Sequence, residues 1–348
     1  MKNGSQPSKA YARAGVDLDL ANRLKGGIQR RVRSTHGPEV LGRIGGFGGL
    51  FRPDFRSMRE PVLVSSVDGV GTKLKIAFAM NRHDTVGQDL VNHCVNDIAV
   101  QGATPLFFLD YLATGKLEPE IVETVVSGIA DACRANGCAL IGGETAQMPG
   151  FYANGEYDLA GFIVGVVDRQ RVITGEKIEV GDILIGLPST GLHTNGYSLA
   201  RKLFFDVARY KPEHYVNALK DKAGAALMKT HRSYLAIIKK LLAAEVVAGM
   251  AHITGGGITE NLPRILPRGK TALVELGSWQ PPPIFQHLQQ LGDVEQDEML
   301  RTFNMGIGLI AVVPAEKFKR TKSLLERTSE KYYVIGRIIK GDRKVLYA

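Results

Sequence analysis

The sequence predicts an α/β (α+β) protein built from two layered domains. Short apolar runs of strand length alternate with longer stretches whose apolar residues recur at helical spacing. At 348 residues, the chain exceeds the roughly 250–300 residues that one hydrophobic core usually supports. A turn-rich stretch around 172–190 interrupts the alternation. We therefore expect an N-terminal domain over 1–170 and a C-terminal α/β layered domain over 171–348.

Between 60 and 170, the first domain is expected to alternate strands with helices. The apolar runs "PVLVSSV", "TPLFFLDYLATG", "CALIGGETA" and "LAGFIVGVVDRQRVI" are typical of strands. Helical spacing is found in "DTVGQDLVNHCVNDIAVQG" and "PEIVETVVSGIADACRANG". Pro119 fits the first turn of the second helix, and Gly137 fits the position after its end.

The second domain is expected to mix strands and helices after the apolar run "DILIGL". Helical patterns cover 197–210 and 223–249, and strands are expected near 271–276, 307–313 and 332–339. "GIGLIA" at 306–311 matches a relaxed dinucleotide-binding pattern. It continues into an apolar run instead of opening a helix, so we interpret it as a strand.

Composition limits the class of protein and its location. No segment reaches the roughly 18 apolar residues that a membrane span needs, so we expect no membrane partner. The start, "MKNGSQPSKA", lacks the apolar segment of a signal peptide, and we expect a mobile tail over 1–10. The three cysteines have no zinc-type spacing, which favours a reducing, cytoplasmic setting.

The net charge of +9 points to an anionic partner. Basic residues gather over 23–33 and include Arg30, Arg31 and Arg33. This stretch could bind nucleic acid, attract a phosphorylated small molecule or form the solvated face of a helix. Because it contains no aromatic residue that could stack on a base, we expect no nucleic-acid partner.

The sequence lacks the usual phosphate-binding and hydrolase motifs. A Walker A loop ending at Lys270 and Thr271 would need glycine at position 264, where the chain has arginine. Neither the metalloprotease pattern H-E-x-x-H nor the nucleophile elbow G-x-S-x-G occurs. If this protein handles phosphate, it uses a less common arrangement.

Three acidic residues stand where predicted elements meet loops or helices. Asp68, Asp97 and Glu144 each lie in a segment rich in glycine, asparagine or threonine. Mg²⁺ takes oxygen ligands, usually from one or two carboxylates and from substrate phosphates. The three acids are therefore candidate metal ligands, although each could instead cap a helix or form a surface ion pair.

Two early glycine-rich segments are candidate contacts for phosphate. In "GGFGG" at 45–49 and "VDGVGTK" at 67–73, small residues would let backbone N–H groups approach an anion. Lys73 could add a positive charge. The alternatives are a flexible loop, a tight turn after a strand and a solvated lysine.

Two later turns have a similar design. "STGLHTNGYS" places His193 and Asn195 before a predicted helix start, which would favour a phosphate, although an uncharged turn histidine is the alternative. In "HITGGGITEN", Thr254 precedes three consecutive glycines, Gly255–Gly257. Such a run has a large entropic cost, so we expect the backbone to approach a ligand there.

Nine segments occur in this order: "AGVDLD", "GGFGG", "DGVGTKLKIA", "VNDIAVQGATPLFFLDYLATGKL", "IGGETAQMPGFY", "GFIVGVVD", "HTNGYSLARK", "HITGGGITENLPRILP" and "RTFNMGIG". Together they closely resemble the phosphoribosylformylglycinamidine cyclo-ligases, the aminoimidazole ribonucleotide synthetases of purine biosynthesis. The resemblance runs from about Tyr11 to beyond Gly336 and so covers almost the whole chain.

This resemblance implies a homodimer in which the N-terminal domains of two subunits form a shared β-barrel, with ATP bound near the interface. It also implies that ATP and formylglycinamidine ribonucleotide give 5-aminoimidazole ribonucleotide, ADP and phosphate. ATP would phosphorylate the formamide oxygen, and the amidine nitrogen would attack the resulting iminophosphate. Such chemistry depends on positioning and charge neutralisation more than on a protein nucleophile.

The resemblance implies roles for the acidic and glycine-rich segments. Asp68, Asp97 and Glu144 would hold Mg²⁺, and Asp68, Lys73 and His193 would be catalytic. The residues that would hold ATP are Gly45, Gly46, Phe47, Gly48, Gly49, Gly69, Gly71, Thr72 and Lys73. The residues that would hold the substrate's ribose phosphate are His193, Asn195, Thr254, Gly255, Gly256 and Gly257.

One position departs from the pattern of the resemblance. Many relatives carry a lysine in the basic stretch after "AGVD", and that lysine is a candidate contact for ATP. Our alignment places Gln29 there, with Lys25, Arg30 and Arg31 close by. Either one of these neighbours makes the contact instead or the contact is dispensable. The role of that lysine is therefore left unassigned.

The same superfamily contains selenophosphate synthetases, thiamine-monophosphate kinases and hydrogenase-maturation proteins. Selenophosphate synthetases typically use a reactive cysteine near the N-terminus, whereas the first cysteine here is Cys94, inside a predicted helix. A kinase would share the ATP loop but not the segments "HTNGYSLARK" and "HITGGGITENLPRILP". The cyclo-ligases therefore remain the favoured family.

Overall fold

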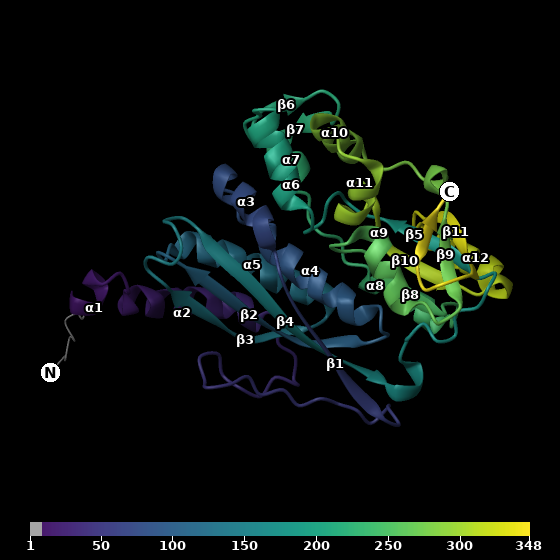
Figure 1. Ribbon diagram of the computed structural model, residues 1–348. Coiled ribbons are helices and arrows are strands. Elements are labelled where there is room, and N and C mark those ends of the chain that lie inside the picture. The colour runs from purple at the N-terminus through teal and green to yellow at the C-terminus, as the bar shows by residue number, and fades with distance from the viewer. Residues whose placement is uncertain (1–8) are drawn as a thin grey trace.

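The computed structural model describes residues 9–348 (Figure 1). The mobile tail predicted over 1–10 falls almost wholly outside these residues. Two large sheets organise the described chain, one of four strands in the first half and one of six in the second. This confirms the predicted mixed α/β architecture. Within residues 9–348, no helix combines the length and the apolar character that crossing a membrane requires.

The N-terminal sheet has the strand order β1-β4-β2-β3. β1 (Pro61–Gly69) and β2 (Thr104–Thr114) pair antiparallel with β4 (Tyr157–Asp168), while β3 (Ala139–Gln147) runs parallel to β2. Parallel neighbours need a crossover, and α5 (Pro119–Asn136) provides it between β2 and β3. The four strands predicted in this half are confirmed.

Helices cover one face of the N-terminal sheet. α4 (Val86–Ala99) packs against β1, β2 and β4, α5 packs against α4, and α2 (Leu18–Arg33) packs against α5. α5 has Pro119 in its first turn and ends at Gly137, whose φ of 68° is left-handed, as predicted. α4 is buried along most of its length, because the sheet covers one side and the C-terminal half contacts the other.

The opposite face of this sheet carries exposed apolar side chains. Val67 on β1 lies beside Phe162 on β4, and these residues are 58% and 43% exposed. Leu63, further along β1, is exposed as well. In Figure 1 the loop over 34–60 runs below the sheet, whereas α4 and α5 lie above it.

The C-terminal sheet has the strand order β12-β9-β11-β5-β10-β8. Its strands are β5 (Ile183–Pro188), β8 (Gly249–His252), β9 (Lys270–Val274), β10 (Ile307–Val313), β11 (Tyr333–Lys340) and β12 (Val345–Tyr347). β10 is an interior strand, and every one of its residues is buried. The interpretation of "GIGLIA" as part of a strand is therefore confirmed.

Shorter elements complete the described chain. They are α1 (Lys9–Arg13), α3 (Leu74–Met80), α6 (Tyr197–Arg201), α7 (Ala223–Leu227), α8 (Leu235–Ala243), α9 (Gly257–Asn261), α10 (Pro283–Gly292), α11 (Gln296–Thr302), α12 (Phe318–Arg327), β6 (Tyr215–Val216) and β7 (Asp221–Lys222). A π-helical turn, Lys202–Val207, continues α6. Together, α6 and this turn account for most of the helix predicted over 197–210.

The single long helix predicted over 223–249 is wrong. α7 ends at Leu227 and α8 begins at Leu235, and the segment between them crosses to α4. Asn92 Nδ2 donates to His231 O, and Asn96 Nδ2 donates to Arg232 O, both at 2.8 Å. These long-range bonds satisfy carbonyl groups that a continuous helix would have satisfied internally.

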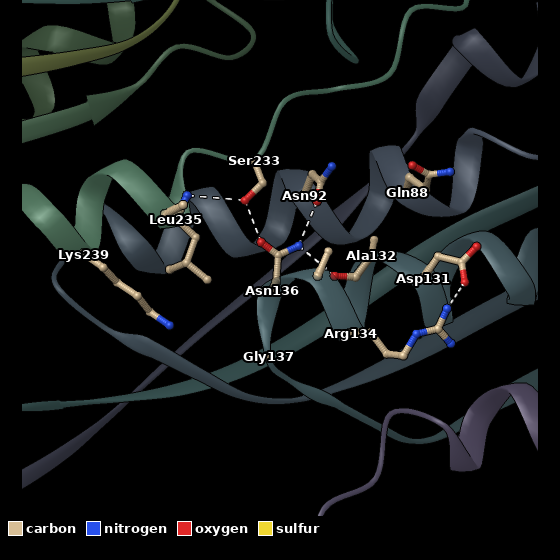
Figure 2. A pocket seen from close by; sticks show the side chains of 12 residues that line it. Gln88, Asn92, Asp131, Ala132, Arg134, Asn136, Gly137, Ser233, Leu235 and Lys239 are labelled. Atoms are coloured by element: carbon tan, nitrogen blue, oxygen red, sulfur yellow. Dashed lines mark hydrogen bonds and ion pairs between the residues drawn. The ribbon is translucent and has the colours of Figure 1, made fainter. Parts of the chain in front are cut away.

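A pocket of about 490 Å³ lies between α4, α5 and α8 (Figure 2). Asn136 on α5 is hydrogen-bonded to the other two walls of the pocket. Asn136 Nδ2 donates to Asn92 Oδ1 at 2.9 Å, and Ser233 Oγ donates to Asn136 Oδ1 at 2.6 Å. No site residue predicted from the sequence lines this pocket. The pocket is therefore separate from the site described below.

Candidate active site

β1 and α4 bring two of the predicted carboxylates close together. Ser66 and Asp68 are two residues apart on β1, so both side chains point to the face that α4 covers. Ser66 Oγ donates to Asp97 Oδ2 at 3.1 Å. His93, one helical turn before Asp97, places its Nε2 2.9 Å from Asp68 Oδ2. Asp68 and Asp97 thus lie at one junction of sheet and helix.

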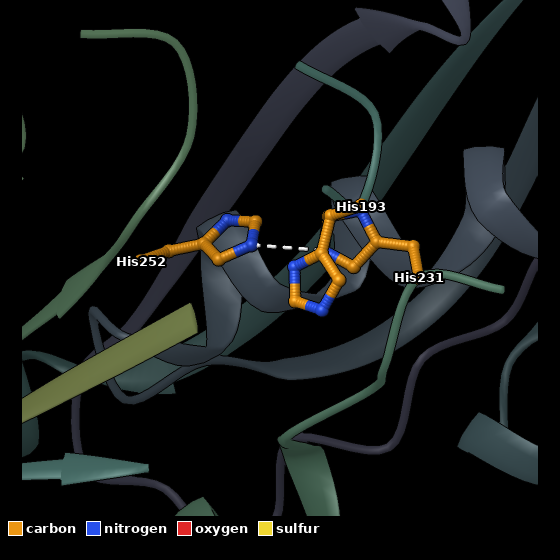
Figure 3. Close-up of side chains that lie close together, drawn as sticks. All are labelled: His193, His231 and His252. Atoms are coloured by element: carbon orange, nitrogen blue, oxygen red, sulfur yellow. Dashed lines mark hydrogen bonds between the residues drawn. The ribbon is translucent and has the colours of Figure 1, made fainter. Parts of the chain in front are cut away.

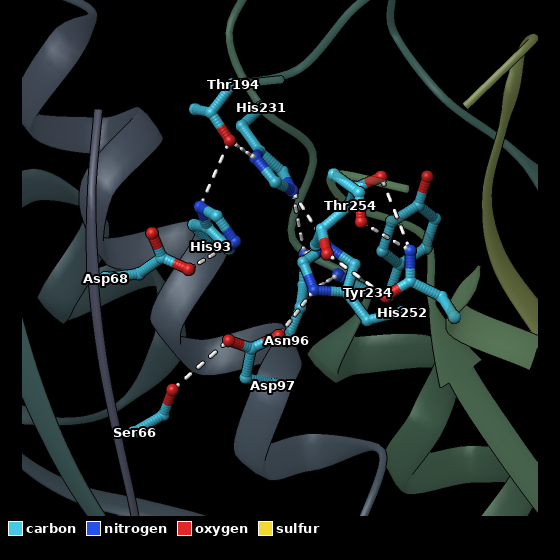
Figure 4. A network of polar contacts seen from close by, with 12 residues as sticks. Ser66, Asp68, His93, Asn96, Asp97, Thr194, His231, Tyr234, His252 and Thr254 are labelled. Atoms are coloured by element: carbon cyan, nitrogen blue, oxygen red, sulfur yellow. Dashed lines mark hydrogen bonds and ion pairs between the residues drawn. The ribbon is translucent and has the colours of Figure 1, made fainter. Parts of the chain in front are cut away.

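A chain of hydrogen bonds runs from Asp97 through the C-terminal half and back to α4 (Figure 4). His252 Nδ1 lies 2.8 Å from Asp97 Oδ1, and His252 Nε2 lies 3.0 Å from His231 Nε2. His231 Nδ1 lies 3.2 Å from Thr194 Oγ1. Thr194 Oγ1 lies 3.0 Å from Nδ1 of His93. We call this arrangement the histidine chain.

The histidine chain, counted to Asp68, contains five hydrogen bonds. Three neutral imidazoles and one hydroxyl supply only four hydrogens, so all five bonds form only when one imidazole is protonated. Burial alone would lower the pKa of His93, but the hydrogen bond and charge of Asp68 outweigh it and raise that pKa. Burial lowers the pKa of His231 and of His252. The extra proton is therefore favoured on His93.

His193 stacks on the histidine chain. Its ring lies within 17° of parallel to the ring of His231, with centroids 4.0 Å apart (Figure 3). Burial lowers the pKa of His193 well below its ordinary value, so the ring is uncharged at neutral pH. The backbone at His193 has a φ of 62°, an uncommon conformation for a residue other than glycine. Such conformations cluster at functional sites.

The glycine turn after β8 lies next to Asn195. A Cβ added at Gly255 would lie 3.2 Å from Asn195 Oδ1. Gly256 and Gly257 have φ values of 92° and 57°, and a Cβ on Gly257 would lie 2.0 Å from a backbone oxygen of α11. Only glycine fits there. Thr254 opens the turn, so the two segments predicted to hold the ribose phosphate do come together.

Lys73 lies in the interior instead of facing an open phosphate site. Its Nζ is 2.8 Å from Asp89 Oδ2, and both side chains are fully buried. It also donates to His193 O at 3.1 Å and to Lys229 O at 2.7 Å. Three oxygen atoms of the protein, Asp89 Oδ2 and the two carbonyls, thus lie within 3.1 Å of the ammonium. This geometry argues against the predicted role of Lys73 in offsetting the charge of ATP.

The two segments predicted to hold ATP lie at opposite edges of the N-terminal sheet. Residues 69–72 follow β1 at one edge. At the other edge, a Cβ added at Gly49 of "GGFGG" would lie 2.8 Å from the Ile141 side chain of β3. Phe47 in the same segment is fully exposed. Within one chain, these two segments do not meet.

Glu144 also lies away from the other two carboxylates. It is in register with Tyr111, which pairs with Ala160, which in turn pairs with Gly69. Three strand spacings of about 4.8 Å therefore separate Glu144 from β1. Residues in one register row share a face, so Glu144 points away from the face on which Asp68 lies. Within one chain, Glu144 does not join Asp68 at a metal.

The sequence analysis did not single out the imidazoles of the histidine chain. The sequence of α4 contains a pattern that could have pointed to His93, because polar residues recur there at the spacing of one helical face. They are Asp89, Asn92, His93, Asn96 and Asp97. On a surface helix such a stripe would face solvent. Here it faces the C-terminal half, and Asp89, His93 and Asn96 are buried.

The fold and the site define a two-domain protein of the AIR synthase related class. The family model described as AIR synthase related protein, N-terminal domain, matches residues 55–167, and its C-terminal counterpart matches residues 179–348. The phosphoribosylformylglycinamidine cyclo-ligase of Alkaliphilus metalliredigens is 52% identical over 98% of this chain and 99% of that relative. The one of Desulfitobacterium hafniense is 54% identical over 97% and 99%.

The chain belongs to the phosphoribosylformylglycinamidine cyclo-ligase family, as the sequence resemblance predicted, and it is a ligase. Solved structures share the fold at low identity. A thiamine-monophosphate kinase from Stenotrophomonas maltophilia has a TM-score of 0.68 at 18% identity over 92% of this chain and 95% of its own. The hydrogenase maturation protein HypE in complex with ATP has a TM-score of 0.66 at 16% identity over 94% and 90%. These likenesses concern the fold alone.

Proposed function

We propose that this chain converts formylglycinamidine ribonucleotide to 5-aminoimidazole ribonucleotide with ATP, releasing ADP and phosphate, in purine biosynthesis in the cytoplasm. The observation that carries the proposal is the meeting of Asp68 and Asp97 with the turns at 193–195 and 254–257 through the histidine chain. This meeting supports a site in which the predicted metal ligands act beside the predicted substrate contacts. The names of the cyclo-ligases that match nearly the full chain support the same reaction.

The proposed reaction has two steps. The γ-phosphoryl group of ATP is transferred to the formamide oxygen and leaves ADP, and the formamide nitrogen loses its proton, which forms the C=N bond of the iminophosphate. The amidine nitrogen then attacks the formyl carbon, the bond from this carbon to the phosphorylated oxygen breaks, phosphate leaves, and the nitrogen loses a proton. An amide oxygen leaves poorly until it is phosphorylated. The protein therefore has to align the groups and offset their charge.

Asp68 and Asp97 suit the binding of Mg²⁺. Their side chains remain 39% and 28% exposed. Each of their four oxygens accepts one hydrogen bond, which leaves further lone pairs for a cation. Carboxylate oxygens are the ligands that Mg²⁺ prefers, and the bound ion would neutralise charge on the transferred phosphoryl group.

The substrate's ribose phosphate is assigned to the turns at 193–195 and 254–257. Glycine there lets backbone N–H groups approach an anion closely. The Asn195 amide can donate hydrogen bonds. His193, uncharged because of its burial, can act as a neutral hydrogen-bond partner. Its stacking on His231 fixes the ring against the histidine chain.

The division of the ATP segments between two sheet edges supports the proposed homodimer. The open sheet face carries Val67 and Phe162, which an isolated chain would leave exposed. A two-fold dimer that covers this face would close the two sheets into a barrel. It would bring the segment 45–49 and Glu144 of one subunit toward residues 68–72 of the other. Glu144 of one subunit would then approach the β1 edge of the other subunit, while Asp68 and Asp97 lie on the sheet face that α4 covers.

The test is phosphate release from ATP with Mg²⁺, measured with and without formylglycinamidine ribonucleotide. We expect release that depends on this substrate, one phosphate per 5-aminoimidazole ribonucleotide, and its loss in Asp68→Asn. Asp84→Asn, an exposed acid paired with Arg82, is the matched control. If phosphate is released at the same rate with and without formylglycinamidine ribonucleotide, the protein catalyses a different reaction.

A further inference from the structure

Lys73 connects the loop after β1 to both segments that carry stacked histidines. It ends a 3-10 turn, Gly71–Lys73, that begins three residues after Asp68. Its Nζ donates to the carbonyl of His193 and to the carbonyl of Lys229, two residues before His231. These segments are 120 and 156 residues distant from Lys73 in sequence. One buried ammonium therefore joins three parts of the proposed site.

Asp89 extends this junction. Its Oδ2 pairs with Lys73 Nζ at 2.8 Å, while its Oδ1 accepts the backbone N–H of His231 at 2.6 Å. Asp89 lies on α4, one turn before His93, and so belongs to the helix that carries the histidine chain. Lys73 thus holds the carbonyl of His193, while Asp89 holds the backbone N–H of His231.

The interior around Lys73 leaves no donor for a phosphate. The Lys73 side chain is fully buried, and its three donors face Asp89 Oδ2 and two carbonyls. Its Nζ also lies 5.6 Å from the centre of the Tyr197 ring, whose hydroxyl donates to Leu227 O at 2.6 Å. A residue enclosed in this way acts through the groups that it holds.

We propose that Lys73 is a positioning residue, which with Asp89 fixes the imidazoles of His193 and His231 and couples them to the Asp68 loop. This inference rests on the proposed function, because that function assigns His193 to the ribose phosphate of the substrate. The buried pair has a mechanical consequence: movement of the loop after Asp68 must move the two carbonyls that Lys73 holds.

The test distinguishes a positioning role of Lys73 from direct binding of phosphate by Lys73. Lys73→Met alone leaves the Asp89 carboxylate buried without its partner and is expected to fold poorly. The double variant Lys73→Met with Asp89→Leu removes both charges and keeps the volume apolar. The matched control is Lys75→Met, since Lys75 forms an exposed pair with Glu156 at 2.5 Å.

Two quantities are measured on the full chain: ATP affinity by calorimetry, and the ¹⁵N signals of the histidine rings by NMR. For the double variant we expect ATP affinity within roughly threefold of wild type, because Lys73 faces no phosphate. We expect the signals of His193 and His231 to shift, and kcat for phosphate release to fall at least about 100-fold. Lys75→Met is expected to change none of these.

The opposite pattern would overturn the inference. If ATP affinity falls tenfold or more while the ring signals of His193 and His231 stay in place, Lys73 is a phosphate contact. If neither quantity changes, it is a structural pair without influence on the site. The NMR measurement needs no turnover, so it tests the positioning even if the protein catalyses a reaction other than the proposed one.

Discussion

The two sides of the proposed site differ in how completely one chain builds them. On the histidine side, buried groups from α4, β8 and the segment 228–234 are joined by short hydrogen bonds. On the ATP side, glycine segments lie at opposite sheet edges, and Phe47 is fully exposed. Under the proposed function, one chain therefore preorganises the substrate side, whereas the ATP side would need a second subunit.

The largest effect is expected from a change on the preorganised side. Asp97→Asn removes one carboxylate charge from the proposed metal site and the anionic acceptor of His252. We expect the rate of phosphate release per enzyme to fall at least about 100-fold. Initial rates at saturating ATP and Mg²⁺ measure it, with Asp84→Asn as the control. A rate within threefold of wild type would remove Asp97 from the metal site.

The next effect concerns the open sheet face. Phe162→Asp places a charge among exposed apolar residues of this face, and we expect the dissociation constant of the proposed dimer to rise at least about 100-fold. Sedimentation over a range of protein concentrations measures this. Val180→Asp, at an exposed apolar residue in the turn before β5, is the control. Equal dissociation constants for both variants would place the interface elsewhere.

A mixed-dimer experiment tests whether the ATP side spans two subunits. Asp68→Asn and Glu144→Gln are each expected to be inactive as homodimers. If each site takes Asp68 from one subunit and Glu144 from the other, a mixed dimer contains one intact site. Random exchange should then restore about a quarter of wild-type activity, since half of the dimers are mixed. No recovery, despite exchange shown by mass spectrometry, would place both residues within one subunit.

The smallest effect concerns the stability of the fold and comes from Asp110, a buried carboxyl on β2. Unlike Asp89 and Asp97 on α4, Asp110 has no charged partner in the described part of the chain. Burial raises the pKa of Asp110 to about 7, whereas an unfolded carboxyl titrates near about 3.9. Between these values the folded state binds more protons, so Asp110 makes the free energy of unfolding fall as pH rises through this window. Asp110→Asn should lessen this fall by at least about 1 kcal/mol between pH 5 and pH 8.

Urea unfolding at these two pH values measures the effect of Asp110→Asn. Asp131→Asn, on the exposed side of α5, serves as the control and should keep the wild-type dependence on pH. If Asp110→Asn also keeps that dependence, the Asp110 carboxyl is solvated enough to titrate as in the unfolded chain.

The local elements of the fold could be predicted because their signals lie within a few residues. The alternation along β1 and the caps of α5 depend on side-chain period and on the conformations of proline and glycine. The long helix over 223–249 could not be corrected from the sequence. It is broken by bonds from Asn92 and Asn96, which lie more than 130 residues away.

The sequence by itself determined the family, the strand and helix pattern, and the segments that carry the site. Tertiary structure alone decided which polar groups are buried and what they face. Lys73 has the sequence context of a phosphate ligand, yet its ammonium is enclosed by Asp89 and two distant carbonyls. Glu144 has the context of a metal ligand, yet its register places it on the other sheet face. The physical reason is that burial and register depend on contacts between distant segments, which local spacing does not encode.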